Sequence, residues 1–328
     1  MGERDMARVA RIREHGGPEV IEWVDVDLPE PGPGEVRIKA IAVGLNFIEI
    51  YQRTGLYPLK LPSGLGGEGV GVIEAIGSGV AAFKVGDRVG TFGPIGSYAT
   101  ARNVPADALI PLPDDVDDRT AAAILLKGGT TEFLIERCAK VQAGQTVLVH
   151  AAAGGVGHLA VGWLKAIGAT VIGTVGSSDK AEGARRAGAD HVIEYKKDDI
   201  AARVKEITGG KGVPVILDGV GKDTWEASLA SAAQRGLIVS YGNASGPVTG
   251  VGLGALASHG SLFVTRPTMF HYYATPEDRK AGFDRVFAML ARGAIKPEIG
   301  QTFALEDVAD AHRALEAGKT EGSTVLLP

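Results

Sequence analysis

The stretch Thr146–Gly168 limits the possible folds of this chain more than any other. It opens with a β-leaning run, Thr146–His150, passes through small residues, and ends in a segment whose apolar residues recur every three or four positions. That spacing is the helical period, so the stretch predicts a strand, a tight turn and a helix. The turn reads Ala152-x-Gly154-x-x-Gly157, a variant of the dinucleotide-binding fingerprint with Ala in the first glycine position.

The small residues of this turn have a physical purpose in nucleotide folds. The chain must reverse tightly, its backbone must approach a pyrophosphate, and the helix must pack close to its strand. The phosphates then lie on the free N–H groups and the positive end of the helix dipole. A chain with 47 glycines in 328 residues also contains such patterns by chance, so a plain strand-to-helix turn is the alternative. The context favours nucleotide binding.

The rest of the chain divides into two kinds of pattern. Residues 1–125 carry short alternating runs separated by Gly and Pro, which predicts a small, partly open β-barrel. The expected strands are Arg8–Ile12, Ile21–Val26, Glu35–Ala42, Gly69–Ile76, Arg88–Thr91 and Ser97–Ala101, with a helical turn at Asn46–Gly55. Ala121–Lys140 reads as helix, broken near Lys127–Thr131.

From Thr146 onward, strands and helices alternate. The expected strands after the first are Thr170–Val175, His191–Tyr195, Val213–Leu217, Gly236–Tyr241 and Ser261–Thr265, with helices at Asp179–Ala187, Asp198–Ile207 and Thr224–Gln234. This alternation predicts an α/β fold, with a doubly wound parallel sheet of the Rossmann type. The rhythm breaks after Arg266. Helices at Arg279–Arg292 and Leu305–Ala317 and a strand at Ser323–Leu327 are expected to return to the first domain.

Composition excludes several classes of function. The net charge of -5 leaves no basic surface for nucleic acid, and no apolar run is long enough to span a bilayer. The N-terminal segment lacks the apolar core of a secretion signal. The single cysteine, Cys138, rules out an intramolecular disulfide framework and fits a reducing compartment, so we expect a cytoplasmic protein.

The residues after the second strand of the nucleotide fold indicate which dinucleotide binds. An NAD enzyme usually places an acid at this strand tip, whereas here Gly176, Ser177 and Lys180 follow the strand, and Tyr195 ends the next one. Small polar groups and a cation suit a 2′-phosphate, so we predict NADPH. A charge-assisted contact from Lys180 contributes roughly 1.5–3 kcal/mol. The alternatives are a solvated Lys180 and an Asp179 that caps the helix or binds the ribose.

Motifs along the chain resemble those of the quinone oxidoreductases, the zinc-free, zeta-crystallin-like branch of the medium-chain dehydrogenase/reductase superfamily. The resemblance is closest to bacterial NADPH:quinone reductases and runs from about Ile12 to Pro328. The motifs are Asn46–Glu49, Tyr51, Gly55–Pro58, Leu61–Gly66, Leu126–Gly128, His150–Gly157, Ile172–Gly176, Ile207–Lys211, Gly242–Asn243 and Val264–Pro267.

The resemblance implies a GroES-like catalytic domain built from both chain ends, residues 1–125 and 268–328, around a Rossmann NADPH-binding domain of residues 126–267. It also implies a homodimer or a homotetramer, of which we expect the homodimer. It places the pyrophosphate on Gly154, Gly155 and Val156, and the 2′-phosphate near Gly176, Lys180 and Tyr195. Further cofactor contacts would come from Phe47, Thr131, Tyr241 and Asn243. Two departures are visible: Gly219 replaces a frequent family serine, and Lys319 stands near a family arginine that reaches the cofactor.

The zinc ligands of related dehydrogenases are missing from the corresponding positions. Asn46 stands at the first cysteine, Gly67 at the histidine, and Lys127 near the last cysteine. Without a thiolate or an imidazole there, a tetrahedral zinc site of the N/S type cannot form. We therefore expect no metal.

A metal-free cleft needs an acceptor that takes up electrons readily, and a quinone does so because reduction restores aromaticity. The residues expected to line the acceptor slot are Asn46, Tyr51, Tyr57, Lys127 and Thr130. Asn46 and Tyr51 could donate hydrogen bonds to the quinone oxygen, and Lys127 could favour the developing anion. Alternatively, the two tyrosines pack the cleft wall and Asn46 caps the short helix.

Two other functions fit the same sequence. One is NADPH-dependent reduction of the activated double bond of an enone or enal. The other is a non-enzymatic, crystallin-like protein that binds NADPH. The intact set of cleft residues argues against the second.

Overall fold

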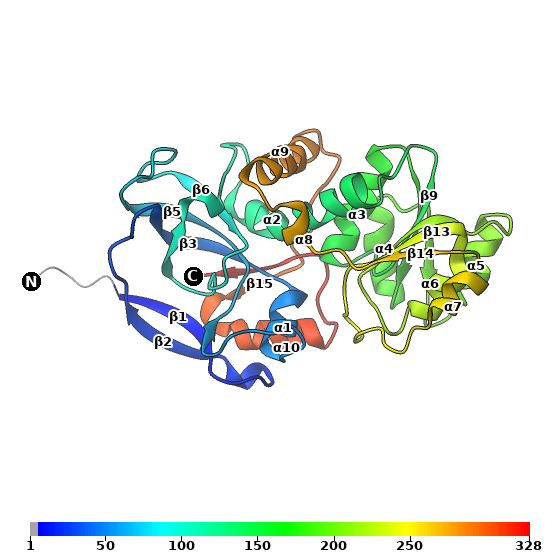
Figure 1. The fold of residues 1–328 in the computed structure, drawn as a ribbon, viewed down its shortest axis with the longest axis horizontal. Coiled ribbons are helices and arrows are strands. Elements are labelled where there is room, and N and C mark those ends of the chain that lie inside the picture. The colour runs from blue at the N-terminus through cyan, green and yellow to red at the C-terminus, as the bar shows by residue number, and fades with distance from the viewer. Residues whose placement is uncertain (1–5) are drawn as a thin grey trace, which may run out of the picture. The chain divides into compact units, whose positions relative to one another are not determined.

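The computed structural model describes residues 6–328, which form two compact units (Figure 1). Unit 1 comprises residues up to Leu126 together with Ile299–Pro328, and unit 2 comprises Lys127–Glu298. The chain therefore leaves and re-enters unit 1, as expected of an inserted domain. The second boundary lies at 298/299 rather than 267/268, because residues 268–298 pack within unit 2. Residues 1–5, the start of the segment considered for a secretion signal, lie outside the described residues.

Unit 2 is built on a six-stranded parallel sheet with the strand order β11-β10-β9-β12-β13-β14. The first strand, β9, lies in the middle, and the chain moves outward from it in both directions. This arrangement is the doubly wound topology, with its crevice at the carboxyl ends of β9 and β12. The strands are β9 (Thr146–Val149), β10 (Thr170–Val175), β11 (His191–Glu194), β12 (Val213–Asp218), β13 (Ala232–Ser240) and β14 (Phe263–Thr265).

Helices cover both faces of this sheet. α3 and α4 contact each other on one face, and α5 and α6 contact each other on the other. The second pair encloses a buried core in which alternate strand residues, such as Leu148, Ile172 and Ile216, meet Trp225 and Leu229. The helices of this unit are α3 (Gly155–Ala166), α4 (Ser178–Arg186), α5 (Ile200–Ile207), α6 (Trp225–Ser231), α7 (Leu253–Ser258), α8 (Met269–Tyr272) and α9 (Pro276–Ala291).

Unit 1 contains two β-sheets. A three-stranded sheet has the order β2-β1-β4, and a seven-stranded sheet has the order β15-β16-β3-β5-β6-β8, with β7 also paired to β3. The strands are β1 (Met6–Ile12), β2 (Glu22–Asp27), β3 (Glu35–Leu45), β4 (Ser63–Gly64), β5 (Glu68–Ile76), β6 (Arg88–Phe92), β7 (Ala101–Pro105), β8 (Leu109–Pro111), β15 (Gln301–Ala304) and β16 (Thr324–Leu327). Strand β16 pairs with β3, so the chain terminus completes the N-terminal sheet.

A buried polar network joins the two chain segments of unit 1. It links α1 (Phe47–Arg53) to α10 (Val308–Glu316). The Arg53 guanidinium donates to His312 Nδ1 at 3.1 Å and pairs with Glu316 at 2.5 Å. Because Arg53 is a permanent donor, the His312 ring must accept at Nδ1 and remain neutral. Burial and the Arg53 charge accordingly lower the pKa of His312 to about 3.

Three sequence expectations were wrong in detail. The helix expected at Thr224–Gln234 ends at Ser231, because strand β13 already begins at Ala232. Helix α2 (Asp118–Glu132) runs unbroken through Lys127–Thr131, and the irregularity lies after it, in a π-helical turn at Phe133–Cys138. Gly129 does not break the helix because its missing side chain admits Tyr273, Met269 and Phe283. The strand expected at Ser97–Ala101 begins only at Ala101. Within residues 6–328, no helix has the length and hydropathy needed to cross a membrane.

Candidate cofactor and acceptor site

The turn after β9 is as tight as its small residues predict. Ala151 adopts a positive φ of 53°, and the Ala151 carbonyl accepts a hydrogen bond from Gly154 N at 2.9 Å. A Cβ on Gly157 would lie 2.2 Å from the same carbonyl oxygen, so only glycine fits there. Ala152 N donates to Thr174 O at 2.9 Å, which ties the turn to β10.

The helix that follows presents its N-terminus to the end of the turn. Gly154 is the N-cap of α3 and supplies no capping side chain, and the first helical hydrogen bond is His158 N to Gly154 O at 2.7 Å. The N–H groups of Gly155, Val156 and Gly157 therefore have no acceptor within the helix. This set of donors fits the pyrophosphate of a dinucleotide.

The residues predicted for the 2′-phosphate come together at the ends of β10 and β11. The Tyr195 hydroxyl lies over Gly176, where an added Cβ would meet it at 2.8 Å. Ser177 is the N-cap of α4, and Lys180 lies in the first turn of that helix. All four residues border the ends of these two strands, as the sequence pattern predicts.

A neighbouring charge cluster escaped the sequence analysis. Glu194 Oε2 accepts from Ser178 Oγ at 2.8 Å and pairs with Lys197 Nζ at 2.7 Å, and Lys197 also donates to Ser178. The hydrogen bond from Lys197, with that from Ser178, lowers the pKa of Glu194. The acid therefore stays ionised but paired. An acid directly before Tyr195 was the one available signal for this cluster.

The carboxyl end of β13 holds the predicted residues Tyr241 and Asn243. Arg266 donates to Gly242 O at 2.7 Å and to Ser240 Oγ at 3.3 Å, so it fixes the backbone on both sides of Tyr241. The motif around Arg266 predicted no specific contact for it, so these two hydrogen bonds are a finding of the structure. Gly219 lies against the Tyr241 ring, where an added Cβ would approach ring and hydroxyl atoms to 2.8 Å. The departure at Gly219 therefore makes room for the tyrosine.

Helix α2 carries Lys127, Thr130 and Thr131. Lys127 is buried, and the Thr131 hydroxyl, also buried, donates back to the Lys127 carbonyl at 2.9 Å. Thr130 is half-buried, with its hydroxyl 3.7 Å from the Met269 sulfur. The three residues thus occupy adjacent turns of one helix, and the Thr131 hydroxyl is already engaged within it.

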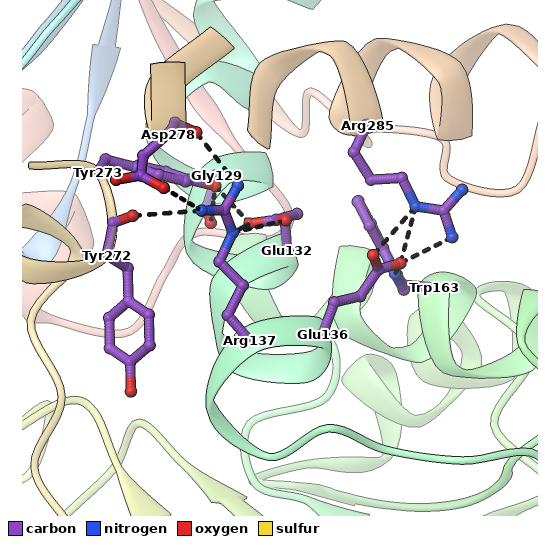
Figure 2. Close-up of polar contacts among 9 residues, drawn as sticks. All are labelled: Gly129, Glu132, Glu136, Arg137, Trp163, Tyr272, Tyr273, Asp278 and Arg285. Carbon is purple, nitrogen blue, oxygen red and sulfur yellow. Dashed lines mark hydrogen bonds and ion pairs between the residues drawn. The ribbon is translucent and has the colours of Figure 1, made fainter. Parts of the chain in front are cut away.

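A polar cluster fixes the end of this helix to α8 and α9, as Figure 2 shows. Tyr273 Oη lies 2.7 Å from Glu132 Oε2 and 3.0 Å from the Gly129 carbonyl. Arg137 donates to both Glu132 oxygens, at 2.9 and 3.0 Å, and also pairs with Asp278. One turn further, Glu136 binds Arg285 and Trp163. These contacts hold the segment that carries Lys127–Thr131.

In unit 1, Asn46 lies at the start of α1 and is largely committed to structure. It forms a capping box with Glu49: the Asn46 side chain accepts from the Glu49 backbone, and Asn46 N donates to Glu49 Oε2 at 2.7 Å. Its Nδ2 donates to Glu68 Oε1 at 2.8 Å. The capping alternative is thus confirmed, and one amide hydrogen remains for a ligand.

Two fully buried carboxylates support this helix start. Glu49 Oε1 also accepts from Gly67 N at 3.1 Å, and Glu68 Oε2 accepts from Leu126 N at 2.6 Å. Backbone N–H groups therefore stabilise both acids in the interior. A Cβ on Gly44 would approach Glu68 Oε1 to 2.1 Å, so the barrel wall is shaped around this acid.

Three aromatic side chains follow one another along α1 and the loop after it. The ring centroids of Phe47 and Tyr51 lie 6.1 Å apart, and those of Tyr51 and Tyr57 lie 5.1 Å apart. The loop is held by Tyr57 N, which donates to Tyr51 O at 2.9 Å. Lys319, also in unit 1, is exposed in the loop after α10.

The positions that correspond to zinc ligands do not fit the metal. Asn46 uses its amide for Glu68 and the helix cap, Gly67 offers only a backbone donor, and Lys127 has an ammonium group. Within residues 6–328, no cluster of three or more His, Cys, Asp or Glu side chains has the geometry of a metal site. The donor set is wrong for zinc at each of the three positions.

Comparison with known proteins agrees with this geometry. Residues 32–114 match the family model of the alcohol dehydrogenase GroES-like domain, and residues 155–288 match that of the zinc-binding dehydrogenases. The chain is 53% identical over 325 residues to quinone oxidoreductase of Pseudomonas aeruginosa, covering 98% of this chain and 100% of that protein. It belongs to the quinone oxidoreductase family of the medium-chain dehydrogenase/reductase superfamily.

Two further members of the superfamily are informative. The crystal structure of Escherichia coli quinone oxidoreductase complexed with NADPH matches with a TM-score of 0.96 at 44% identity, covering 98% of this chain and 100% of that one. A 2-haloacrylate reductase from Burkholderia is 42% identical over 331 residues, covering 98% of this chain and 99% of that protein. The predicted Rossmann sheet and GroES-like domain are confirmed.

The contact between Gly219 and Tyr241 gives a direct test of this part of the site. A side chain at 219 meets only the far end of the Tyr241 ring, which can swing away, so Gly219→Ser should displace the ring with little loss of stability. We expect NADPH to bind several-fold more weakly while the melting temperature falls by no more than a few degrees.

The matched control is Gly252→Ala, because no atom lies within 4 Å of a Cβ at that position. In Gly219→Ser/Tyr241→Ala the serine no longer has a ring to displace. The double variant should therefore bind NADPH no more weakly than Tyr241→Ala alone. Unchanged NADPH affinity in Gly219→Ser would show that the contact between Gly219 and Tyr241 is not part of the cofactor site.

Proposed function

We propose that this chain is an NADPH-dependent quinone reductase that works without a metal ion. The observation that carries the proposal is its identity of 53% to a quinone oxidoreductase along nearly its whole length. The close structural relative with bound NADPH supports the choice of cofactor. The cation and small polar groups after β10 support it independently, because they suit a 2′-phosphate.

Three groups of residues would hold NADPH. The turn of Ala152, Gly154, Gly155, Val156 and Gly157 would receive the pyrophosphate, and Gly176, Ser177, Lys180 and Tyr195 the 2′-phosphate. Phe47, Thr131, Tyr241 and Asn243 would contact the nicotinamide and its ribose, and Lys319 would reach the cofactor in place of a family arginine. When bound, NADPH supplies the reducing equivalents. The protein supplies position and a polar environment.

The acceptor would lie against residues that can stabilise negative charge on a quinone oxygen. Asn46 has one amide hydrogen left after its bond to Glu68, and the Tyr51 hydroxyl is a second possible donor. Lys127 contributes a positive charge, while Tyr57 and Thr130 shape the slot. Donors aimed at developing charge in a water-poor site are more effective than the same donors in water. The proton that completes reduction can come from water.

A panel of acceptors tests the proposed function. Loss of NADPH absorbance should be rapid with o- and p-quinones and slow with enones, enals and 2-haloacrylates. Faster turnover of the double-bond substrates would assign the chain to the activity named for the Burkholderia relative. Tight NADPH binding without turnover of any acceptor would assign it to the non-enzymatic class.

The same assay tests the acceptor residues. Tyr51→Phe should lower kcat about tenfold, the effect of losing roughly 1.4 kcal/mol of transition-state stabilisation. The NADPH dissociation constant should stay unchanged. The matched control is Tyr98→Phe, which removes a buried hydroxyl in the same unit that contacts His312 instead. Equal kcat in Tyr51→Phe and the wild type would mean that Tyr51 only packs against its neighbours and does not act on the acceptor.

The proposal extends to a homodimer in the cytoplasm. Strand β14 ends the parallel sheet, and Phe263 and Val264 on it are 62% and 38% exposed, with Leu253 nearby in sequence 81% exposed. An apolar edge strand is a template for pairing with a second chain. Cys138 is a free, half-buried thiol, which fits a reducing compartment.

Light scattering after size exclusion tests the dimer. The wild type should elute with twice the mass of one chain, and Phe263→Glu should shift it toward the monomer because the charge would be buried in the pairing. The control is Val85→Glu, since Val85 is 61% exposed but lies in unit 1. A wild type that runs as a monomer at micromolar concentration would refute this part of the proposal.

A further inference from the structure

His150 forms a buried network that the proposed chemistry does not use. His150 directly follows the last residue of β9, and its side chain is fully buried. Nδ1 lies 3.0 Å from Thr174 Oγ1 on β10, and Nε2 lies 3.0 Å from Ser228 Oγ on α6. Both ring nitrogens are therefore engaged, each by a hydroxyl that can donate or accept.

The Asp218 carboxylate determines which group donates and which accepts in each hydrogen bond of this network. Its carboxylate accepts from Val220 N at 2.9 Å, from Gly221 N at 3.0 Å and from the hydroxyls of Thr224 and Ser228. A carboxylate has no proton to donate, so Ser228 must donate its single proton to Asp218, at 3.0 Å. Ser228 Oγ can then only accept from His150, which places the imidazole proton on Nε2. Nδ1 is left to accept from Thr174.

The surroundings of His150 keep it uncharged. Burial lowers the pKa of His150, and the Asp218 charge opposes that shift without reversing it. A lowered pKa means that the neutral form persists at neutral and alkaline pH and extends to lower pH than in an ordinary histidine. The hydrogen-bond pattern and the electrostatics thus both require a neutral imidazole ring.

Both strands beside β9 hold His150 and the turn together. Thr174 acts twice, because its hydroxyl donates to His150 while its carbonyl accepts from Ala152 N at 2.9 Å. On the other side, the Leu217 carbonyl accepts from His150 N at 3.0 Å, and the next residue, Asp218, reaches the ring through Ser228. The residue between these anchors is Ala151, with its φ of 53°.

We propose that His150 is a positioning residue for the dinucleotide turn. Thr174, Ser228 and Asp218 hold its ring as the neutral Nε2–H tautomer, and the ring sets the direction of the backbone from Ala151 to Gly154. The N–H groups that receive the pyrophosphate are thereby aimed before the cofactor arrives, which lowers the cost of binding. This role rests on the proposed binding of NADPH at the turn.

Variants that differ by one hydroxyl group test the positioning role. Thr174→Val keeps the shape of the side chain but removes its donor, and Ser228→Ala breaks the link to Asp218. Each should raise the NADPH dissociation constant about five- to tenfold, measured by nicotinamide fluorescence, with kcat at saturating NADPH within twofold of the wild type. Thr174→Ser keeps the hydroxyl and should restore the affinity.

Ser231→Ala is the matched control. Ser231 lies in the same helix as Ser228 and is fully buried, but its hydroxyl has no hydrogen-bond partner within residues 6–328, so its loss should leave NADPH affinity unchanged. If Thr174→Val and Ser228→Ala lower the melting temperature without weakening NADPH binding, the network is only structural and the inference is overturned. Failure of the wild type to bind NADPH would overturn the proposed function instead.

Nitrogen NMR of the histidines in the wild-type protein provides a test that does not depend on variants. The His150 ring should show one protonated nitrogen, Nε2, and should not titrate between pH 7 and 9. An Nδ1–H tautomer, or a charge change within that range, would contradict the proton order derived from Asp218.

Discussion

The approach of Gly157 to the Ala151 carbonyl is the constraint on which the nucleotide-binding unit depends. An added Cβ at Gly157 would lie 2.2 Å from that oxygen, so helix α3 can begin where it does only with glycine there. The close start leaves the first N–H groups of the helix open toward the crevice of the doubly wound sheet. The left-handed conformation of Ala151 costs about 1–2 kcal/mol. The backbone N–H groups of His150 and Ala152 donate to carbonyls of the flanking strands β12 and β10, which offsets this cost.

In unit 1, the backbone is held in place by two buried carboxylates. Glu49 and Glu68 are fully buried, yet each accepts backbone N–H bonds, and Asn46 connects them at the start of α1. Asn46 and Gly67, two of the positions compared with zinc ligands, are part of this hydrogen-bonded support. The aromatic residues Phe47 and Tyr51 lie on the helix that begins there, and Tyr57 lies in the loop after it.

Much of this could be predicted from sequence, for identifiable reasons. The strands and helices of unit 2 have strong periodicity, and β10 begins and ends where the pattern places it. Helix α2 was wrongly expected to break at Lys127–Thr131, because the sequence does not show that Tyr273 fills the space beside Gly129. The second domain boundary was expected near residue 268 but lies at residue 298 for a related reason. Residues 268–298 are held in unit 2 by contacts between residues far apart in sequence, such as the ion pair of Arg285 with Glu136. The capping box of Asn46 was foreseeable, whereas its bond to Glu68, 22 positions away, was not.

The most direct test of the cofactor assignment is an equilibrium titration with NADPH and with NADH, followed by nicotinamide fluorescence. The two molecules differ only in the 2′-phosphate, so the ratio of their dissociation constants reports on Gly176, Ser177, Lys180 and Tyr195 alone. We expect NADPH to bind at least tenfold more tightly, a difference of about 1.4 kcal/mol. Lys180→Ala should reduce that ratio and leave NADH unaffected. Equal constants for the two cofactors in the wild type would contradict the assignment.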